Sequence, residues 1–373
     1  MFLGELVLKI GFVGLGKLGL PCAEVIAKKG YNVSGVDIDN KIHSTIVSLE
    51  KDLYTMASDR DIIFVAVPTP HKEKYDGSFP TSHLPSCDFD YNIVKDVLNR
   101  LNKIMTKDQL LVLISTVLPG TTRREFINLV TNTRFVYNPF LIAMGSVSWD
   151  FVNPEIVMIG TEDGKTSGDA ALLVDFYKSI MENDPEYIVG TWDECECIKV
   201  FYNTFISTKI AFVNMIQDVA VKQGNINANF VASSLTKCHQ RLISDKYMKP
   251  GMGDGGSCHP RDNTALRYLS DSLNLGYDIF GHIMFVREKQ AENMAKEILK
   301  ISNIVHFSSD SFKEGVTSTD GSYSLLVQHF ILKHGGNIVN RRDCEVFVKV
   351  HESDSVPDDK IVFDVWNDYG NKY

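Results

Sequence analysis

Short apolar runs alternate with segments of helical spacing over the first half of the chain. Buried-strand patterns cover residues 9–13, 32–36, 61–67, 109–114 and 155–160, and helical periodicity covers 20–29 and 90–104. Strands that are apolar at nearly every position are typical of a parallel sheet covered on both faces by helices. The pattern predicts an α/β fold that starts with a Rossmann-like doubly wound domain over residues 1–190.

A long uninterrupted helical pattern follows this domain. Residues 194–222 contain no glycine or proline, and their apolar positions recur at helical spacing. We expect a spine helix that also offers a dimer surface, followed by more helix to about residue 246 and again over 263–301. These segments predict a central helical dimerisation domain over residues 191–301.

The pattern changes again after residue 302. Strand-like runs at 303–307, 337–339 and 360–365 flank a helical segment at 322–334, which Gly335 and Gly336 end. This predicts a small C-terminal α/β domain over residues 302–373.

Composition narrows the class of protein. The 373 residues are 44% hydrophobic and 23% charged, as in ordinary globular proteins, and the formal net charge of −9 argues against nucleic acid or an anionic membrane as a partner. Seven cysteines without framework spacing point to a reducing compartment, so we expect a cytoplasmic protein. Cys195 and Cys197 are too weak a pair to predict a metal site. We expect neither a membrane span nor a leader peptide.

A glycine-rich turn joins the first predicted strand to the first helix. The turn fits the pattern GxGxxG and comprises Gly14, Gly16, Lys17, Leu18 and Gly19. The first two glycines allow a tight turn and the approach of a pyrophosphate to the helix N-terminus, and the third lets the helix pack closely on the strand. Asp37, at the end of the next strand, would accept the ribose hydroxyls and repel a 2′-phosphate. The sequence therefore predicts NAD as the cofactor, and the alternative is a glycine turn without a ligand.

Small polar residues and prolines follow the ends of two further strands. Pro68 and Thr69 come after the strand at 61–67, and Thr116 comes after the strand at 109–114. Residues in these places line the ligand crevice of a doubly wound sheet. We expect all three to contact the cofactor.

The densest chemistry lies between Pro250 and Asp262. Four glycines (Gly251, Gly253, Gly255 and Gly256) precede Cys258, and Asp262 follows four residues later. If a helix begins near Cys258, the thiol and the carboxylate share one face, and the helix N-terminus favours a thiolate. The alternative is a glycine turn with a structural cysteine.

Together these stretches resemble the UDP-glucose/GDP-mannose dehydrogenase family, whose members oxidise the C6 alcohol of a nucleotide sugar to a carboxylate with NAD. The resemblance covers nearly the whole chain. Its motifs are Gly14 to Pro21, Val67 to Pro70, Ser115 to Gly120, Glu196 to Asn203, Pro250 to Asp262, and Phe312-Lys313 with the following Ser322. The cysteine loop is the most specific of them.

The resemblance implies a role for each matching residue. Cys258 would add to the intermediate aldehyde to form a thiohemiacetal, a second hydride transfer would give a thioester, and water would release the acid. Lys199 and Asn203 would stabilise the oxyanion, and Asp262 would assist proton transfer through water. The remaining implied contacts are a water held by Thr116, and substrate contacts from Lys199, Asn203, Gly251, Gly253, Gly255, Gly256, Cys258 and Lys313.

Several positions depart from the family pattern, among them residues 141–144 and the four named below. Phe140 stands where the family has a glutamate that assists thioester hydrolysis, and Asp320 stands where it has an arginine that reaches a substrate across the dimer. Asp254 replaces a phenylalanine and Arg261 a lysine. These changes leave three functions open: a UDP-glucose 6-dehydrogenase, a dehydrogenase for GDP-mannose or a UDP-N-acetylhexosamine, and a binding protein with weak or no catalysis.

Overall fold

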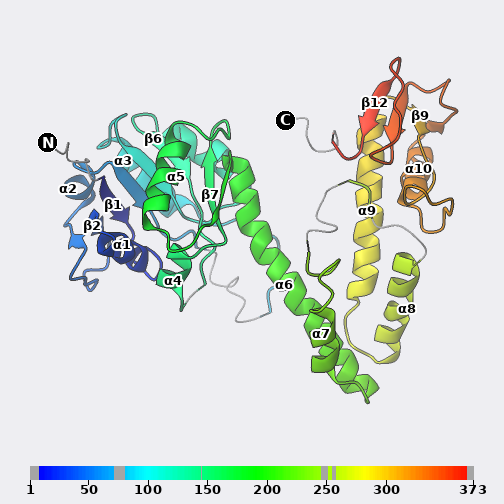
Figure 1. Ribbon diagram of the computed structural model, residues 1–373, viewed down its shortest axis with the longest axis horizontal. Coiled ribbons are helices and arrows are strands. Elements are labelled where there is room, and N and C mark those ends of the chain that lie inside the picture. Colours follow the sequence, from blue (N-terminus) through cyan, green and yellow to red (C-terminus); the bar gives the residue numbers. More distant parts are fainter. Residues whose placement is uncertain (1–7, 71–79, 144, 245–250, 254–257, 368–373) are drawn as a thin grey trace. The chain divides into compact units, whose positions relative to one another are not determined.

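A computed structural model describes residues 8–70, 80–143, 145–244, 251–253 and 258–367 (Figure 1). The chain forms two compact units, Met1–Thr208 and Lys209–Tyr373. Each unit is described by itself below. Among the described residues, no helix has both the length and the apolar character that crossing a membrane would require.

The first unit is built on an eight-stranded sheet. Its strands lie in the order β3-β2-β1-β4-β5-β6-β7-β8, and all neighbours are parallel except β6 and β7. The bounds are β1 Lys9–Val13, β2 Asn32–Val36, β3 Ser48–Leu49, β4 Ile62–Val65, β5 Leu110–Leu113, β6 Arg134–Tyr137, β7 Ile156–Thr161 and β8 Glu186–Thr191. The chain reverses its winding direction between β1 and β4, which is where ligands bind in open α/β sheets.

Helices cover both faces of this sheet, as the apolar strands predict. Ile62 and Phe64 of β4 belong to one core, and Ile63 and Val65 belong to the other. Helices α1 (Gly19–Lys28) and α5 (Asp169–Ile180) pack into the first core, and α2 (Leu53–Ala57) and α3 (Asn92–Asn102) pack into the second. The prediction of a Rossmann-like domain is confirmed.

Helix α6 (Trp192–Gln223) starts directly after β8 and confirms the long helix that the pattern predicts. Its first turns are anchored in the sheet domain, because Trp192, Cys195 and Glu196 are buried there. Short helices, α4 (Val147–Val152), η2 (Thr122–Phe126) and η3 (Ile127–Leu129), complete the first unit.

The second unit contains a four-stranded parallel sheet in the order β10-β9-β11-β12. Its elements are α7 Ala228–Leu235, α8 Cys258–Ser272, α9 Ile279–Leu299, β9 Ile304–Phe307, α10 Tyr323–Lys333, β10 Asn337–Ile338, β11 Val346–Lys349 and β12 Ile361–Asp364. Its core is formed by α9 and α10 against the sheet. The predicted small α/β fold is confirmed, although β11 was not predicted.

The helix expected to continue to about residue 246 ends earlier, at Leu235. The hydroxyls of Ser233, Ser234 and Thr236 donate to backbone carbonyls three or four residues earlier. Such side-chain bonds compete with the helix ladder. Residues 236–243 accordingly form turns, and residues 245–250 lie outside the described part of the chain.

Candidate active site

The glycine turn after β1 has the geometry that a bound diphosphate needs. Gly14 adopts a φ of +90°, and a Cβ atom there would lie 2.7 Å from the Ala66 carbonyl oxygen. A Cβ on Gly19 would lie 1.9 Å from the Gly14 carbonyl oxygen, so only glycine lets α1 start this close to β1. Gly16 and Lys17 are exposed at the start of α1, where backbone N–H groups favour an anion.

Asp37 holds this turn in place. Its carboxylate accepts hydrogen bonds from the backbone N–H groups of Leu15 (2.6 Å) and Asp39 (2.8 Å). The carboxylate therefore lies beside the glycine turn at the end of β2, where the sequence analysis expects the ribose. Its contact with a ribose stays a prediction, as does the contact of Leu18 with the cofactor.

The ends of β4 and β5 are joined by side-chain hydrogen bonds. The Thr69 hydroxyl donates to the Thr116 carbonyl at 2.7 Å, and the Ser115 hydroxyl donates to the Val67 carbonyl at 2.5 Å. Pro68 is exposed between these two contacts. Pro68, Thr69 and Thr116 thus lie together at the sheet edge that carries the glycine turn.

A buried carboxylate fastens the Thr116 loop to α6. Glu196 is fully buried, and its two oxygens accept from the backbone N–H groups of Gly120 (2.6 Å) and Thr122 (2.7 Å). Burial raises the pKa of Glu196. The sequence analysis gave Glu196 no role, although an acid one turn before Lys199, directly after the apolar positions Trp192 and Cys195, was the available signal.

Lys199 projects from α6 toward the segment that follows β6. Its Nζ donates to the Phe140 carbonyl oxygen at 2.6 Å, and burial lowers its pKa. Asn203 lies one turn further along α6 and lines the same cavity of about 460 Å³. The structure therefore brings Lys199 and Asn203 together, as their spacing predicts.

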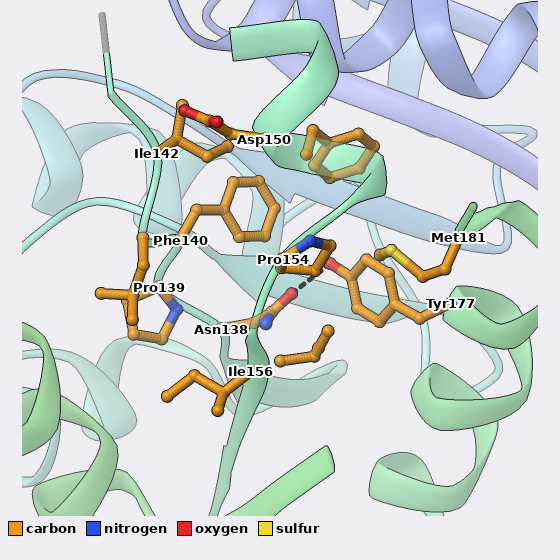
Figure 2. Close-up of a pocket in the computed structure, with 12 residues that line it drawn as sticks. Asn138, Pro139, Phe140, Ile142, Asp150, Pro154, Ile156, Tyr177 and Met181 are labelled. Atoms are coloured by element: carbon orange, nitrogen blue, oxygen red, sulfur yellow. Dashed lines mark hydrogen bonds between the residues drawn. The ribbon is translucent and has the colours of Figure 1, made fainter. Parts of the chain in front are cut away.

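Phe140 belongs to the core of the first unit. Its ring lies 5.2 Å from the Phe151 ring, centroid to centroid, and lines a small cavity of about 20 Å³ (Figure 2). The neighbouring Asn138 amide donates to the Met158 carbonyl and accepts from the Tyr177 hydroxyl. Where the resemblance expects a carboxylate, this chain thus presents an apolar ring to the core and a backbone carbonyl to Lys199.

In the second unit, α8 begins at Cys258, as the cysteine-loop hypothesis requires. Cys258 is exposed, and Asp262 follows one turn later. The Arg261 guanidinium contacts the Asp262 carboxylate from Nε and Nη2, both at 2.9 Å, and this carboxylate raises the pKa of Arg261.

Two of the loop glycines pack against aromatic rings of the same unit. A Cβ on Gly251 would lie 2.3 Å from the Trp366 ring, and one on Gly253 would lie 2.2 Å from the Tyr323 ring. Asp254, Gly255 and Gly256 lie outside the described residues.

Lys313 and Asp320 are exposed in the segment between β9 and α10. Substrate binding by Lys313, Gly251 and Gly253 stays a prediction.

Comparison with known proteins identifies the class, which is that of NAD-dependent nucleotide-sugar dehydrogenases. The profile described as the NAD binding domain of the UDP-glucose/GDP-mannose dehydrogenase family matches residues 40–181, and the profile of that family's central domain matches residues 193–288. Together the two matches span more than half of the chain. The chain belongs to the UDP-glucose/GDP-mannose dehydrogenase family, and its cofactor is NAD.

Individual relatives differ in their sugar. The UDP-glucose 6-dehydrogenase of Rickettsia prowazekii is 28% identical over 318 residues, which cover 78% of this chain and 69% of that protein. The GDP-mannose 6-dehydrogenase of Pseudomonas aeruginosa is 26% identical over 321 residues, covering 76% and 69%. A crystal structure of a ternary complex of GDP-mannose dehydrogenase from Pseudomonas aeruginosa shares the fold, with a TM-score of 0.82 at 21% identity over 96% of each chain.

Proposed function

We propose that this protein oxidises C6 of a nucleotide sugar to the carboxylate, with UDP-glucose as the first substrate to test. The observation that carries the proposal is the pairing of Lys199 and Asn203 in one cavity at the edge of the sheet whose β1 holds the NAD turn. A cation with lowered pKa and an amide donor suit a developing oxyanion.

The first oxidation removes a hydride from C6 and a proton from its hydroxyl, which leaves an aldehyde. NAD supplies the acceptor for each of the two hydrides. In the proposed roles, Asp262 passes the hydroxyl proton to solvent through water held by Thr116.

The second oxidation needs a covalent step, because an aldehyde has no hydride to give until a nucleophile adds. The Cys258 thiolate adds to the carbonyl carbon, and Lys199 and Asn203 stabilise the resulting oxyanion. Loss of the second hydride gives a thioester. Water then adds to its carbonyl, and the C–S bond breaks to release the acid and the thiolate.

The test is anaerobic incubation with NAD and UDP-glucose, following NADH by absorbance and Cys258 by intact mass. Two NADH per sugar with free enzyme at the end is the expected result. One NADH per sugar would indicate an alcohol oxidation that stops at the aldehyde. The same series with GDP-mannose and UDP-N-acetylhexosamines identifies the sugar, since relatives with either UDP-glucose or GDP-mannose in their names match this chain.

The Cys258→Ala variant tests the covalent step. It should yield at most one NADH per sugar, because no thiohemiacetal forms. Two NADH per sugar from this variant would contradict the thioester mechanism. A burst of NADH that leaves a sugar adduct on Cys258 in the wild type would show that hydrolysis is stalled.

A nucleotide-sugar binding protein with weak or no catalysis is the second candidate. Phe140 favours it, because its side chain lies in the core and supplies no carboxylate for hydrolysis. Binding without NADH from any of these sugars would support this candidate.

A further inference from the structure

The cavity beside Lys199 and Asn203 has walls that the proposed chemistry does not use. Its volume of about 460 Å³ suits a sugar, since ligand pockets span about 300–1,000 Å³. The part of the cavity wall that does not come from α6 is formed by residues 141–143, by α4 and by the α4–β7 connection. Trp149 lies on α4, and Glu155 is the last residue of that connection.

Because β7 runs antiparallel to β6, the start of β7 lies at the same end of the sheet as the end of β6, and Glu155 is located there. Tyr137, the last residue of β6, pairs with Gly160 of the antiparallel β7, and the Asn138 amide donates to the Met158 carbonyl at 2.6 Å. The chain leaving β6 therefore runs alongside β7 toward its first residue, Ile156. Glu155 immediately precedes that residue, which explains why it lines the same cavity as Lys199.

Some polar groups of the cavity have hydrogen-bond partners within the protein, and others do not. The Asp150 carboxylate accepts from the Ala143 N–H and the Ser146 hydroxyl, both at 2.8 Å, and the Asn153 amide donates to the Trp149 carbonyl at 3.1 Å. Lys199 uses one of its three donors on Phe140. In the described part of the chain, no side chain or backbone group engages the Glu155 carboxylate.

Trp149 gives the cavity an aromatic surface. Trp149 lines the cavity, and 64% of the residue stays exposed, although large aromatic side chains usually bury most of their area. A hexopyranose offers a matching face, because its axial C–H groups form an apolar patch beside a ring of hydroxyls. An exposed indole that lines the same cavity as the Glu155 carboxylate and the Asn203 amide is complementary to that combination.

We propose that Trp149 and Glu155 determine which sugar the cavity accepts. The indole stacks on the C–H face of the hexose, and the carboxylate, which can only accept hydrogen bonds, selects a sugar that presents hydroxyl donors at that side. The ligand is a nucleotide-linked hexose with free hydroxyls there, so an N-acetylated hexose binds less well. This inference rests on the proposed function, because it takes the nucleotide sugar as the ligand.

Calorimetric titration without NAD separates the sugar from the nucleotide. Kd is measured for UDP-glucose and UDP, and for GDP-mannose and GDP, with UDP-N-acetylglucosamine as the substituted sugar. Glu155→Gln and Trp149→Ala should each weaken nucleotide-sugar binding by about tenfold and leave the free nucleotides within about twofold, as expected for one charged hydrogen bond or one stacking contact. Glu155→Asp should recover part of the loss.

Glu186→Gln is the matched control. Glu186 is exposed and pairs with Ile156 across the β7–β8 ladder, one position from Glu155, so its substitution should not change binding. Equal weakening of nucleotide and nucleotide sugar in Glu155→Gln would overturn the inference. A change in the oligomeric state of Trp149→Ala, seen as a change of molecular mass in solution, would also overturn it, because the indole would then belong to an interface between copies.

The inference and the proposed function fail in different ways. NADH formation by the wild type, with variants that bind sugars as the wild type does, overturns the subsite alone. Sugar-dependent binding that Trp149 and Glu155 control, without NADH, overturns the dehydrogenase and leaves the subsite standing. A wild type that binds no nucleotide sugar overturns both.

Discussion

The positive charge of Lys199 and the burial of its side chain have opposing effects on stability. Its ammonium is half-buried and donates to the Phe140 carbonyl, and burial lowers its pKa. A folded-state pKa below the unfolded value of about 10.4 means that the unfolded chain binds more protons in the window between the two. The charged side chain therefore costs stability at neutral pH, and this cost falls as the pH rises through that window.

We predict that Lys199→Met abolishes NADH formation and leaves the free energy of unfolding within about 1 kcal/mol of the wild type at pH 7. The wild type should gain stability relative to the variant as the pH rises toward the unfolded-state pKa of about 10.4. NADH absorbance measures the loss of activity, and urea unfolding at several pH values measures the two effects on stability. A variant that unfolds at pH 7 would show that the ammonium is structurally required.

Glu196 has the opposite character, because both its oxygens are used by the fold. In Glu196→Gln, one acceptor becomes an NH₂ group that faces a backbone N–H of Gly120 or Thr122. We predict a loss of about 2–3 kcal/mol in the free energy of unfolding, the cost of a buried unsatisfied pair. Glu162→Gln, an exposed control in the same unit, should be neutral. If the two variants had equal free energies of unfolding in urea, the hydrogen bonds of Glu196 would not stabilise the fold as proposed.

At the scale of elements, α9 and α10 are joined through one carboxylate. Glu292 is buried on α9 and contacts Lys289 (2.8 Å), Lys296 (3.1 Å) and His334 (3.0 Å), the residue that directly follows α10. Hydrogen bonds from Lys289, then Lys296 and His334, lower its pKa to about 2. A lowered carboxyl pKa contributes stability above the unfolded pKa of about 4.3, and this contribution is lost as the pH falls toward 2.

Glu292→Gln should therefore lower the Tm by about 3–5 °C near neutral pH. The difference from the wild type should shrink steadily between about pH 4.3 and 2. Glu297→Gln is the control on the same helix, because its pair with Lys300 is largely exposed. Thermal scans across this pH range decide the point, and a gap that persists at pH 2 would contradict the electrostatic explanation.

Most elements with a strong helical period or a continuous apolar run were predictable, although α5 was not predicted. The period-3.6 run from 194 to 222 identified α6, and the glycine turn located α1 to within one residue. Strand β8 was missed because it is half-exposed and passes into α6 without a loop, and β11 was missed because its three consecutive apolar residues define no period.

Some residues of the candidate site could likewise be predicted from the sequence, and others could not. Lys199 and Asn203 could be paired from their spacing, because both lie on one helix. Glu196 could not be placed in this way, because its partners Gly120 and Thr122 lie 76 and 74 residues away in sequence. Glu155 could not either, because the antiparallel return of β7 brings it to the site. Such contacts are fixed by tertiary packing, which no local pattern encodes.

At the scale of the whole molecule, α6 leaves an apolar surface uncovered. Phe201, Ile210, Phe212, Val213 and Val221 are exposed on it, and Ile210 keeps 53% of its area accessible. Exposed apolar surface of this extent marks a protein interface. The central helix was expected to form a dimer surface, and we propose a second copy of this chain as the partner.

We predict that the purified protein elutes with about twice the monomer mass of 41.9 kDa in light scattering. Ile210→Asp should shift it to the monomer, because a C2 interface meets each charge twice, once on each copy. Tyr54→Asp, on α2 of the sheet domain, is the matched control, since it adds the same charge at a residue of similar exposure and should leave the dimer intact. Dissociation of both variants would indicate a general effect of charge. A dimeric Ile210→Asp protein would show that the dimer interface does not include this surface of α6.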